Sequence, residues 1–183
     1  MILMRHGQSE FNLHFSATKR DPGIKDPKLT PEGQAQAEEA ARALRDAGIR
    51  RIIASPYTRA LQTAAPIAAA LDLPVLVNPV VRERYHFACD IGTPISRLAP
   101  AWPQHDFSHI DEIWWPAETE DTPSIVARAT LFSADMTATD DWRDTLVVSH
   151  WAFILTLTGE SLENGTYIRF NPLNGHAPSW PDR

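Results

Sequence analysis

The chain has 183 residues, enough for one domain of ordinary size with a sizeable core. Its 43% hydrophobic and 22% charged composition excludes a disordered or fibrous protein. A formal net charge of −6 argues against binding to nucleic acid or to an anionic membrane surface. The single cysteine, Cys89, excludes an internal disulfide and a cysteine-rich metal site. No signal peptide or membrane-spanning run is recognisable, so a cytoplasmic location is expected.

Strand and helix signals alternate along the chain, with proline and glycine marking many of the boundaries. The first half predicts a strand at 2–4, a helix at 9–15, a helix at 30–46, a strand at 51–54 and a helix at 55–71 kinked at Pro66. The second half predicts a strand at 75–77, a helix at 122–139, a strand at 145–149, a helix at 152–158 and an edge strand at 166–170.

This alternation predicts an α/β fold with a mainly parallel sheet flanked by helices on both faces. Residues 1–183 show no internal repeat and no linker, which favours one domain. The stretch at about 86–122 has no clear period and is rich in proline and tryptophan. It is longer than a structural connection needs, so it predicts a short irregular cap insertion over one edge of the sheet.

Charged and titratable residues follow several of the predicted strands. Arg5-His6 follows the first strand, Ser149-His150 the fourth, Arg59 lies one turn into the helix after the second, and Arg82-Glu83-Arg84 follows the third. Ligands of open α/β sheets bind beyond the carboxyl ends of the strands. Taken alone, each group is more simply a structural histidine or a solvated charge. Their joint occurrence at one edge favours a site for a phosphate-type group.

Several blocks of the sequence resemble, in family order, those of the histidine phosphatase (phosphoglycerate-mutase-like) superfamily. They are Met4 to Asn12 (MRHGQSEFN), Leu29 to Gly33 (LTPEG), Ser55 to Ala64 (SPYTRALQTA), Val147 to His150 (VVSH) and the smaller Asn164-Gly165. The blocks span most of the chain, and their combination is highly specific. The resemblance implies the α/β fold and phosphoryl-transfer chemistry of that superfamily.

The resemblance also implies roles for individual residues. His6 would be the phosphorylated nucleophile, Arg5, Arg59 and His150 the phosphate pocket, Glu83 the proton donor, and Gln8 and Asn12 further substrate contacts, with Arg84 an additional candidate for substrate binding. Two arginines and a second histidine can stabilise the charge on a phosphoryl group under attack. We therefore expect no metal and no cofactor.

The proposed chemistry sets requirements on two side chains. His6 must be neutral at its attacking nitrogen, and a hydrogen bond from the other nitrogen to a backbone carbonyl would fix that tautomer. Glu83 must be protonated to release the alcohol. Partial burial near an anionic substrate would raise its pKa, whereas Arg82 and Arg84 would lower it.

The cap bears on the choice among three functions. It carries seven carboxylates (Asp90, Asp106, Asp111, Glu112, Glu118, Glu120 and Asp121) against one basic residue, Arg97. We expect it to repel a second phosphate, which favours a phosphomonoesterase for a small phosphate ester over a bisphosphate-dependent mutase. The third alternative is a non-catalytic phosphate-binding relative. The residues do not indicate an oligomeric state.

Tryptophans near the site allow two interpretations. Trp102, Trp114 and Trp115 could cover the sheet, which is the simpler interpretation, or stack on an apolar leaving group. Trp151 follows His150, where many superfamily members have a small residue. It is either a core residue that begins a helix or a bulky wall that narrows the pocket.

Overall fold

The computed structural model describes residues 1–174 and 177–180. Its sheet has five strands in the order β3-β2-β4-β1-β5. Their bounds are Ile2–Arg5 (β1), Arg51–Ala54 (β2), Val75–Val77 (β3), Thr145–Ser149 (β4) and Tyr167–Arg169 (β5). The first four are mutually parallel, and β5 pairs antiparallel with β1 at the edge. The predicted mainly parallel sheet and its last edge strand are confirmed.

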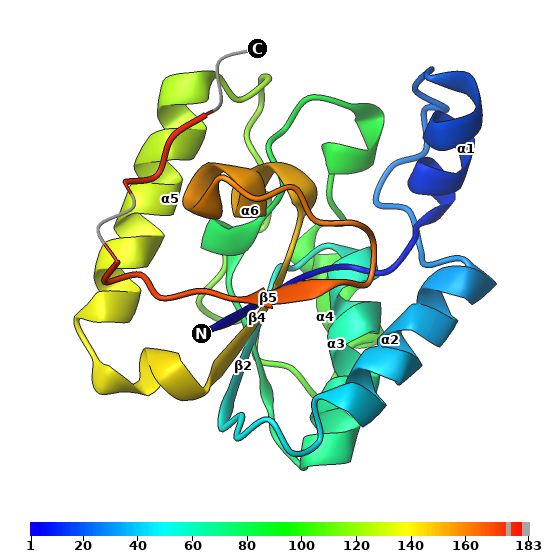
Figure 1. The fold of residues 1–183 in the computed structure, drawn as a ribbon. Helices are drawn as coiled ribbons and strands as arrows, with labels where there is room; N and C mark the ends of the chain where they lie inside the picture. Colours follow the sequence, from blue (N-terminus) through cyan, green and yellow to red (C-terminus); the bar gives the residue numbers. More distant parts are fainter. Residues whose placement is uncertain (175–176, 181–183) are drawn as a thin grey trace.

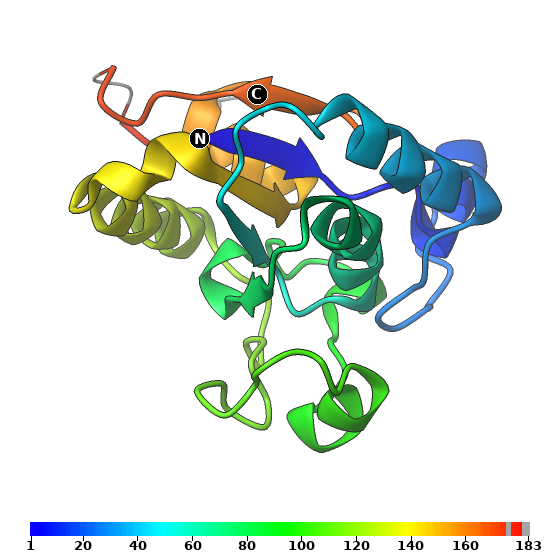
Figure 2. The same cartoon turned by 90° about the horizontal axis from the view of Figure 1, so that it is seen from below.

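Helices cover both faces of the sheet (Figures 1 and 2). Their bounds are Glu10–Thr18 (α1), Pro31–Ala43 (α2), Thr58–Leu71 (α3), Ile95–Ala101 (α4), Thr122–Thr137 (α5) and Trp151–Thr158 (α6). Because strand side chains alternate, Ile2 and Met4 pack in one core with α2 and α3, whereas Leu3 packs in a second core with α5 and α6. No helix among the described residues is long and apolar enough to cross a bilayer.

Several helix ends differ from the prediction by a few residues. α2 stops at Ala43 rather than Asp46 because the chain tightens into turns there, with the Ala47 amide bonding to the Leu44 carbonyl at 3.1 Å. α3 continues through Pro66 as one helix. Its end at Asp72, in the left-handed region with φ 53°, is stabilised by a bond to the Ala68 carbonyl.

The cap insertion is more regular than the sequence indicates. It contains α4 and a short 3-10 helix at Ala88–Asp90. Both prolines of the α4 region are compatible with a helix: Pro94 lies at its N-cap, and Pro100 lies in its last turn. The insertion lies at the β3 edge, where the His109 ring bonds to the Val77 carbonyl at 2.9 Å. Its predicted place over one edge of the sheet is confirmed.

The loop after β1 is held close to the start of α2. Thr30 caps α2 by accepting from the Gly33 amide at 3.1 Å, and its hydroxyl also donates to the Gln8 side chain at 2.9 Å. A Cβ on Gly33 would lie 2.0 Å from the Gln8 carbonyl oxygen, so only glycine permits this approach. The second sequence block therefore fixes the loop that carries His6.

Candidate active site

The two histidines of the sequence blocks lie side by side at the carboxyl edge of the sheet. β1 and β4 are parallel neighbours, with Arg5 opposite Ser149 in the register. The residues that follow, His6 and His150, therefore emerge together, and the His6 amide donates to the Ser149 carbonyl at 3.0 Å. Their ring centroids are 5.0 Å apart, and both side chains are buried.

The His6 ring is held in one tautomer by its own loop. Its Nδ1 lies 2.7 Å from the Gly7 carbonyl oxygen. Because a carbonyl only accepts hydrogen bonds, Nδ1 must carry the hydrogen. Burial, together with Arg59 and Arg5, lowers the pKa of His6 well below its usual 6.5. The ring is therefore neutral, Nε2 keeps its lone pair, and the structure shows the predicted carbonyl contact.

Buried polar atoms around His6 lack a partner among the described residues. They are Nε of Arg5 and both ring nitrogens of His150. A buried polar group without a hydrogen bond costs on the order of 1–3 kcal/mol. Burial, followed by Arg59 and His6, lowers the pKa of His150 well below its usual value. A neutral imidazole has one N–H, so Nε of Arg5 and one ring nitrogen of His150 are donors that oxygen atoms of a bound anion would satisfy, and they indicate a ligand.

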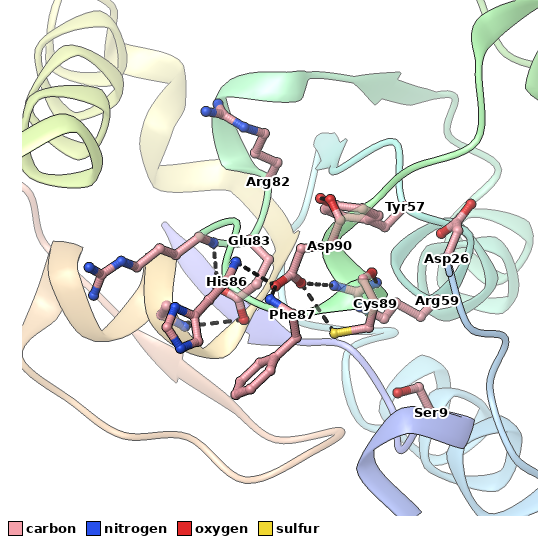
Figure 3. A network of polar contacts seen from close by, with 12 residues as sticks. Ser9, Asp26, Tyr57, Arg59, Arg82, Glu83, His86, Phe87, Cys89 and Asp90 are labelled. Atoms are coloured by element: carbon pink, nitrogen blue, oxygen red, sulfur yellow. Dashed lines mark hydrogen bonds and ion pairs between the residues drawn. The ribbon is translucent and has the colours of Figure 1, made fainter. Parts of the chain in front are cut away.

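Arg59 lies in the same cluster but is partly engaged by the cap (Figure 3). One terminal nitrogen donates to the Cys89 carbonyl at 2.8 Å, and the other pairs with Asp90 at 3.3 Å. The guanidinium also lies 4.2 Å from the centroid of the Tyr57 ring. A guanidinium has five N–H donors, so these two contacts leave others for an anion.

Glu83 stands at the start of α6, close to His6 and Arg5. Its carboxylate accepts from the Ala152 amide at 3.0 Å and from the Arg84 amide at 2.9 Å. Burial, and then the nearby Asp90 carboxylate, raise the pKa of Glu83 to about 7. A group with this pKa can both give and take a proton near neutral pH. Of the two opposing effects that the sequence indicates, burial therefore outweighs the nearby positive charges.

The groups that oppose this shift differ from the expected ones. The Arg84 backbone amide, Arg59 and Arg5 lower the pKa of Glu83, rather than the side chains of its two chain neighbours. The Arg82 side chain points away from the site, as Figure 3 shows, and pairs with Glu120 at 3.0 Å. The alternation of side chains along an extended segment explains why Arg82 and Glu83 face opposite ways.

A buried ion-pair cluster fixes the segment that carries Glu83. Arg128 of α5 bonds to Glu120 through Nε at 2.9 Å and through a second nitrogen. Its remaining nitrogen donates to the carbonyls of Val80 and Arg82 at 2.8 and 2.7 Å. One guanidinium thus ties the cap, α5 and the 80–83 backbone together, and it positions Glu83 without touching the site.

Of the other two predicted substrate contacts, Asn12 lines the cavity and Gln8 does not. Asn12 lines the cavity, and its side-chain oxygen accepts from Ser9 and from Asn164. Asn164 also donates to the His6 carbonyl at 3.1 Å, so the smaller tail block supports the loop that carries His6. Gln8 does not line the cavity: its side-chain oxygen accepts from Thr30, and this contact is structural.

A cavity of about 520 Å³ opens above the reacting groups. From the sequence-predicted set it includes Arg5, His6, Asn12, Arg59, Glu83 and Arg84. His150 lies behind His6 and packs edge-on against Tyr57, with ring centroids 5.1 Å apart. Trp151 lines the cavity, which supports its interpretation as a wall, and its Nε1 donates to Ser161 at 2.9 Å.

The expected repulsion from an acidic cap is wrong for most of its carboxylates. Asp90 alone among the seven lines the cavity, and it is paired with Arg59. Glu120 faces two arginines, and Glu112 bonds to Ser96. Because the cap folds against the β3 edge, its remaining acids point to solvent rather than toward the substrate space.

The structure supports the simpler interpretation of the three cap tryptophans, because none of them lines the cavity. Trp114 is buried edge-on against Tyr57, with its Nε1 donating to the Thr93 carbonyl at 2.9 Å. Trp102 and Trp115 pack on the same core. These residues cover the sheet, in line with the simpler interpretation.

Residues that sequence reasoning did not assign to the site also line this cavity. They are Ser9, Phe11, Phe15, His86, Phe87, Cys89, Asp90, Ala152 and Trp180. Asp90 links the cap to the site, since it accepts from Arg59 as well as from the backbone amides of His86 and Phe87. No short motif marks such a residue, because it is brought in by the fold of the cap.

No group of three His, Cys, Asp or Glu side chains within residues 1–174 and 177–180 is arranged to hold a metal ion. The positive charge of the site comes from Arg5 and Arg59, whose guanidinium groups remain protonated at any physiological pH.

Residues 1–175 match the model of the histidine phosphatase superfamily (branch 1), and the chain belongs to this superfamily. An uncharacterized protein of Mycobacterium tuberculosis (strain CDC 1551 / Oshkosh) is 34% identical over 171 residues, covering 87% of this chain and 79% of the relative. A 2,3-bisphosphoglycerate-dependent phosphoglycerate mutase of Methylobacterium sp. (strain 4-46) is 44% identical over 89 residues, covering 46% of this chain and 41% of the mutase.

A solved structure of mycobacterial glucosyl-3-phosphoglycerate phosphatase superposes with a TM-score of 0.64 at 22% identity. It covers 91% of this chain and 87% of that one. Likeness at this identity shows a shared fold. Phosphatases and phosphoglycerate mutases are thus both similar to this chain, and the predicted superfamily and fold are confirmed.

Replacing Asp90 tests how the cap tunes the site. In Asp90→Asn the carboxylate that helps to raise the pKa of Glu83 is gone, so that pKa falls from about 7. A proton donor with a lower pKa loses its proton earlier. We therefore expect the alkaline limb of the kcat/KM profile for an alkyl phosphate to move to lower pH.

The matched control is Asp106→Asn, which changes an exposed acid of the same insertion and should leave the profile unchanged. Thermal melting of both variants would show whether the fold is retained. A limb that stays in place, or moves to higher pH, would contradict the assigned role of Asp90.

Proposed function

We propose that the protein is a phosphomonoesterase that acts through a phosphohistidine at His6. The observation that carries this proposal is the set of orphaned buried nitrogens on Arg5 and His150 around a neutral His6. Arg5 lines the cavity together with His6, and the His150 ring centroid lies 5.0 Å from that of His6, so both are neighbours of the nucleophile that we propose. Charge on the phosphoryl oxygens is stabilised there by fixed donors without reorganisation.

The first step transfers the phosphoryl group to the enzyme. The Nε2 lone pair of His6 forms a bond to phosphorus, and the bond from phosphorus to the ester oxygen breaks. Glu83, which is protonated below its pKa of about 7, gives its proton to the leaving oxygen. An alkoxide is a poor leaving group in water, so this proton transfer contributes a factor of about 10²–10⁴.

The second step returns the enzyme to its starting state. The Glu83 carboxylate takes a proton from water as the water oxygen bonds to phosphorus and the bond to Nε2 breaks. Inorganic phosphate leaves, and Glu83 is again protonated. The two steps balance within the site, with Arg5 and Arg59 holding the phosphoryl oxygens, so that neither a metal nor a cofactor takes part.

The alternatives place different demands on the cavity. A bisphosphate-dependent mutase must hold a second phosphate, and Arg84 is the one further cation among the described lining residues. That side chain is already bonded through Nε to the Glu120 carbonyl at 2.9 Å. A non-catalytic binding protein has no use for a carboxyl group with a raised pKa beside the phosphate site. Both features favour hydrolysis.

The test is hydrolysis of 4-nitrophenyl phosphate and of an alkyl phosphate in the presence of EDTA. We expect turnover of both, release of inorganic phosphate, and no interconversion of 2- and 3-phosphoglycerate when 2,3-bisphosphoglycerate is added. Phosphate binding without turnover would favour the non-catalytic alternative. Rapid bisphosphate-primed interconversion would favour the mutase.

A further inference from the structure

Two aromatic walls enclose the part of the cavity beyond the reacting groups. The first wall consists of Phe11, Phe15 and Phe87, whose ring centroids lie 5.2–5.4 Å apart. The second wall consists of Trp151 and Trp180, which meet edge-to-face at 6.1 Å. All five line the cavity. They come from α1, the cap, α6 and the C-terminal segment, so the fold brings them together from distant parts of the chain.

Both walls offer ring surface to a ligand. Four of the five rings, all except Phe11, are only half-buried, although large apolar side chains are usually covered. The packing of each wall explains why it does not collapse into the site: Phe15 stacks on Phe11, and the Arg84 guanidinium lies 4.6 Å from the Trp180 ring centroid. The uncovered faces are therefore a property of the folded protein.

Some of the polar groups at this end of the cavity are already engaged. Ser9 and Asn12 bond to each other, at 2.8 Å between hydroxyl and amide oxygen. The Arg84 side chain bonds to the cap backbone and packs on Trp180. The ring faces themselves offer no hydrogen bond to the hydroxyls of a sugar or of glycerol, which would lose bonds to water where they lie against these walls.

We propose that the substrate is a phosphate monoester whose alcohol carries a flat apolar group, such as an aromatic ring. The phosphate would lie on His6, and the ring would lie between the two walls. This rests on the proposed phosphatase function and adds the chemical class of the leaving group. Aromatic contacts of this kind contribute about 0.5–1.5 kcal/mol each beyond area burial, so two of them give roughly tenfold in affinity.

The test compares 2-phenylethyl phosphate with glycerol 1-phosphate. Both alcohols are primary alkyl leaving groups that need a proton, so a difference in rate reports the contacts of the rest of the molecule. We expect kcat/KM to be about tenfold or more higher for the phenylethyl ester, based on the same aromatic contacts. Benzylphosphonate should also inhibit more strongly than methylphosphonate, which measures binding without turnover.

Variants assign the preference to the walls. Phe87→Ala removes a ring from the first wall and Trp151→Ala one from the second, and each should lower the ratio of the two kcat/KM values. Leu131→Ala, an exposed apolar residue of α5, should leave the ratio as it is. If either alanine variant fails to fold, Phe15→Leu takes its place, because it removes a ring from the first wall but keeps an apolar side chain. It should also lower the ratio.

The outcomes separate the two proposals. Equal kcat/KM values for both esters, or a preference for the glycerol ester, would overturn the proposal that the alcohol carries an aromatic group. The proposed phosphatase function would still stand. A ratio that no wall variant changes would overturn the walls as its cause. Absence of hydrolysis of any ester, with no labelled enzyme, would overturn the phosphatase function itself.

Discussion

His6→Ala is expected to abolish turnover of phosphate esters. In the proposed mechanism the neutral Nε2 of His6 is the nucleophile, and its loop holds the ring through the 2.7 Å contact to the Gly7 carbonyl. Removal of a covalent nucleophile leaves only the stabilisation that the remaining donors provide. A loss on the order of 10⁴-fold or more in kcat is therefore expected. Initial rates with 4-nitrophenyl phosphate measure it.

Two further measurements make this result specific. His14→Ala changes an exposed histidine of α1 and should keep full activity. Inorganic phosphate should still bind to His6→Ala, as measured by calorimetry, because Arg5 and Arg59 are unchanged. Activity in His6→Ala within a few-fold of the parent protein would contradict a phosphohistidine mechanism.

Glu83→Gln is expected to have the second largest effect, and one that depends on the ester. Glutamine can still accept from the Ala152 and Arg84 amides, so the fold should be kept. It cannot transfer a proton, so kcat for an alkyl phosphate should fall by about 10²–10⁴. With 4-nitrophenyl phosphate the leaving group needs no proton, and only the later attack by water should be slow.

Rapid-mixing kinetics should therefore reveal a burst of 4-nitrophenol in Glu83→Gln, stoichiometric with the enzyme, followed by slow turnover. The alkaline limb that reflects deprotonation of Glu83 near pH 7 should also disappear from the profile for an alkyl ester. Glu118→Gln, an exposed acid of the cap, is the control. Equal losses with both esters and no burst would show that Glu83 is not the proton donor.

The sequence predicts the central part of the molecule because its signals are local. Short apolar runs separated by capping residues are enough to indicate the strands, and Thr30-Pro31 marks the start of α2 at the observed residue. The placement of His6 beside His150 follows from the rule that parallel strands end at the same edge of a sheet. Neither requires knowledge of distant contacts.

The surroundings of the site could not be predicted in this way, because they depend on contacts between residues far apart in the chain. Asp90 lies 31 residues from Arg59 and shows no pattern that links the two. The cap tryptophans were plausible stacking residues by composition, yet the cavity is walled by phenylalanines of α1 and by Trp180. The expected cap repulsion was wrong for the same reason: a charge count cannot show that Glu120 faces Arg82 and Arg128.

The most direct test of the mechanism is to identify the residue that carries the phosphoryl group. The protein would be mixed briefly with a ³²P-labelled ester, quenched in alkaline detergent, digested and analysed by mass spectrometry. We predict a label that is stable in alkali, lost in acid, and located on the peptide that contains His6. Label on another residue, Cys89 of the same cavity included, would contradict the account, as would turnover without any labelled enzyme.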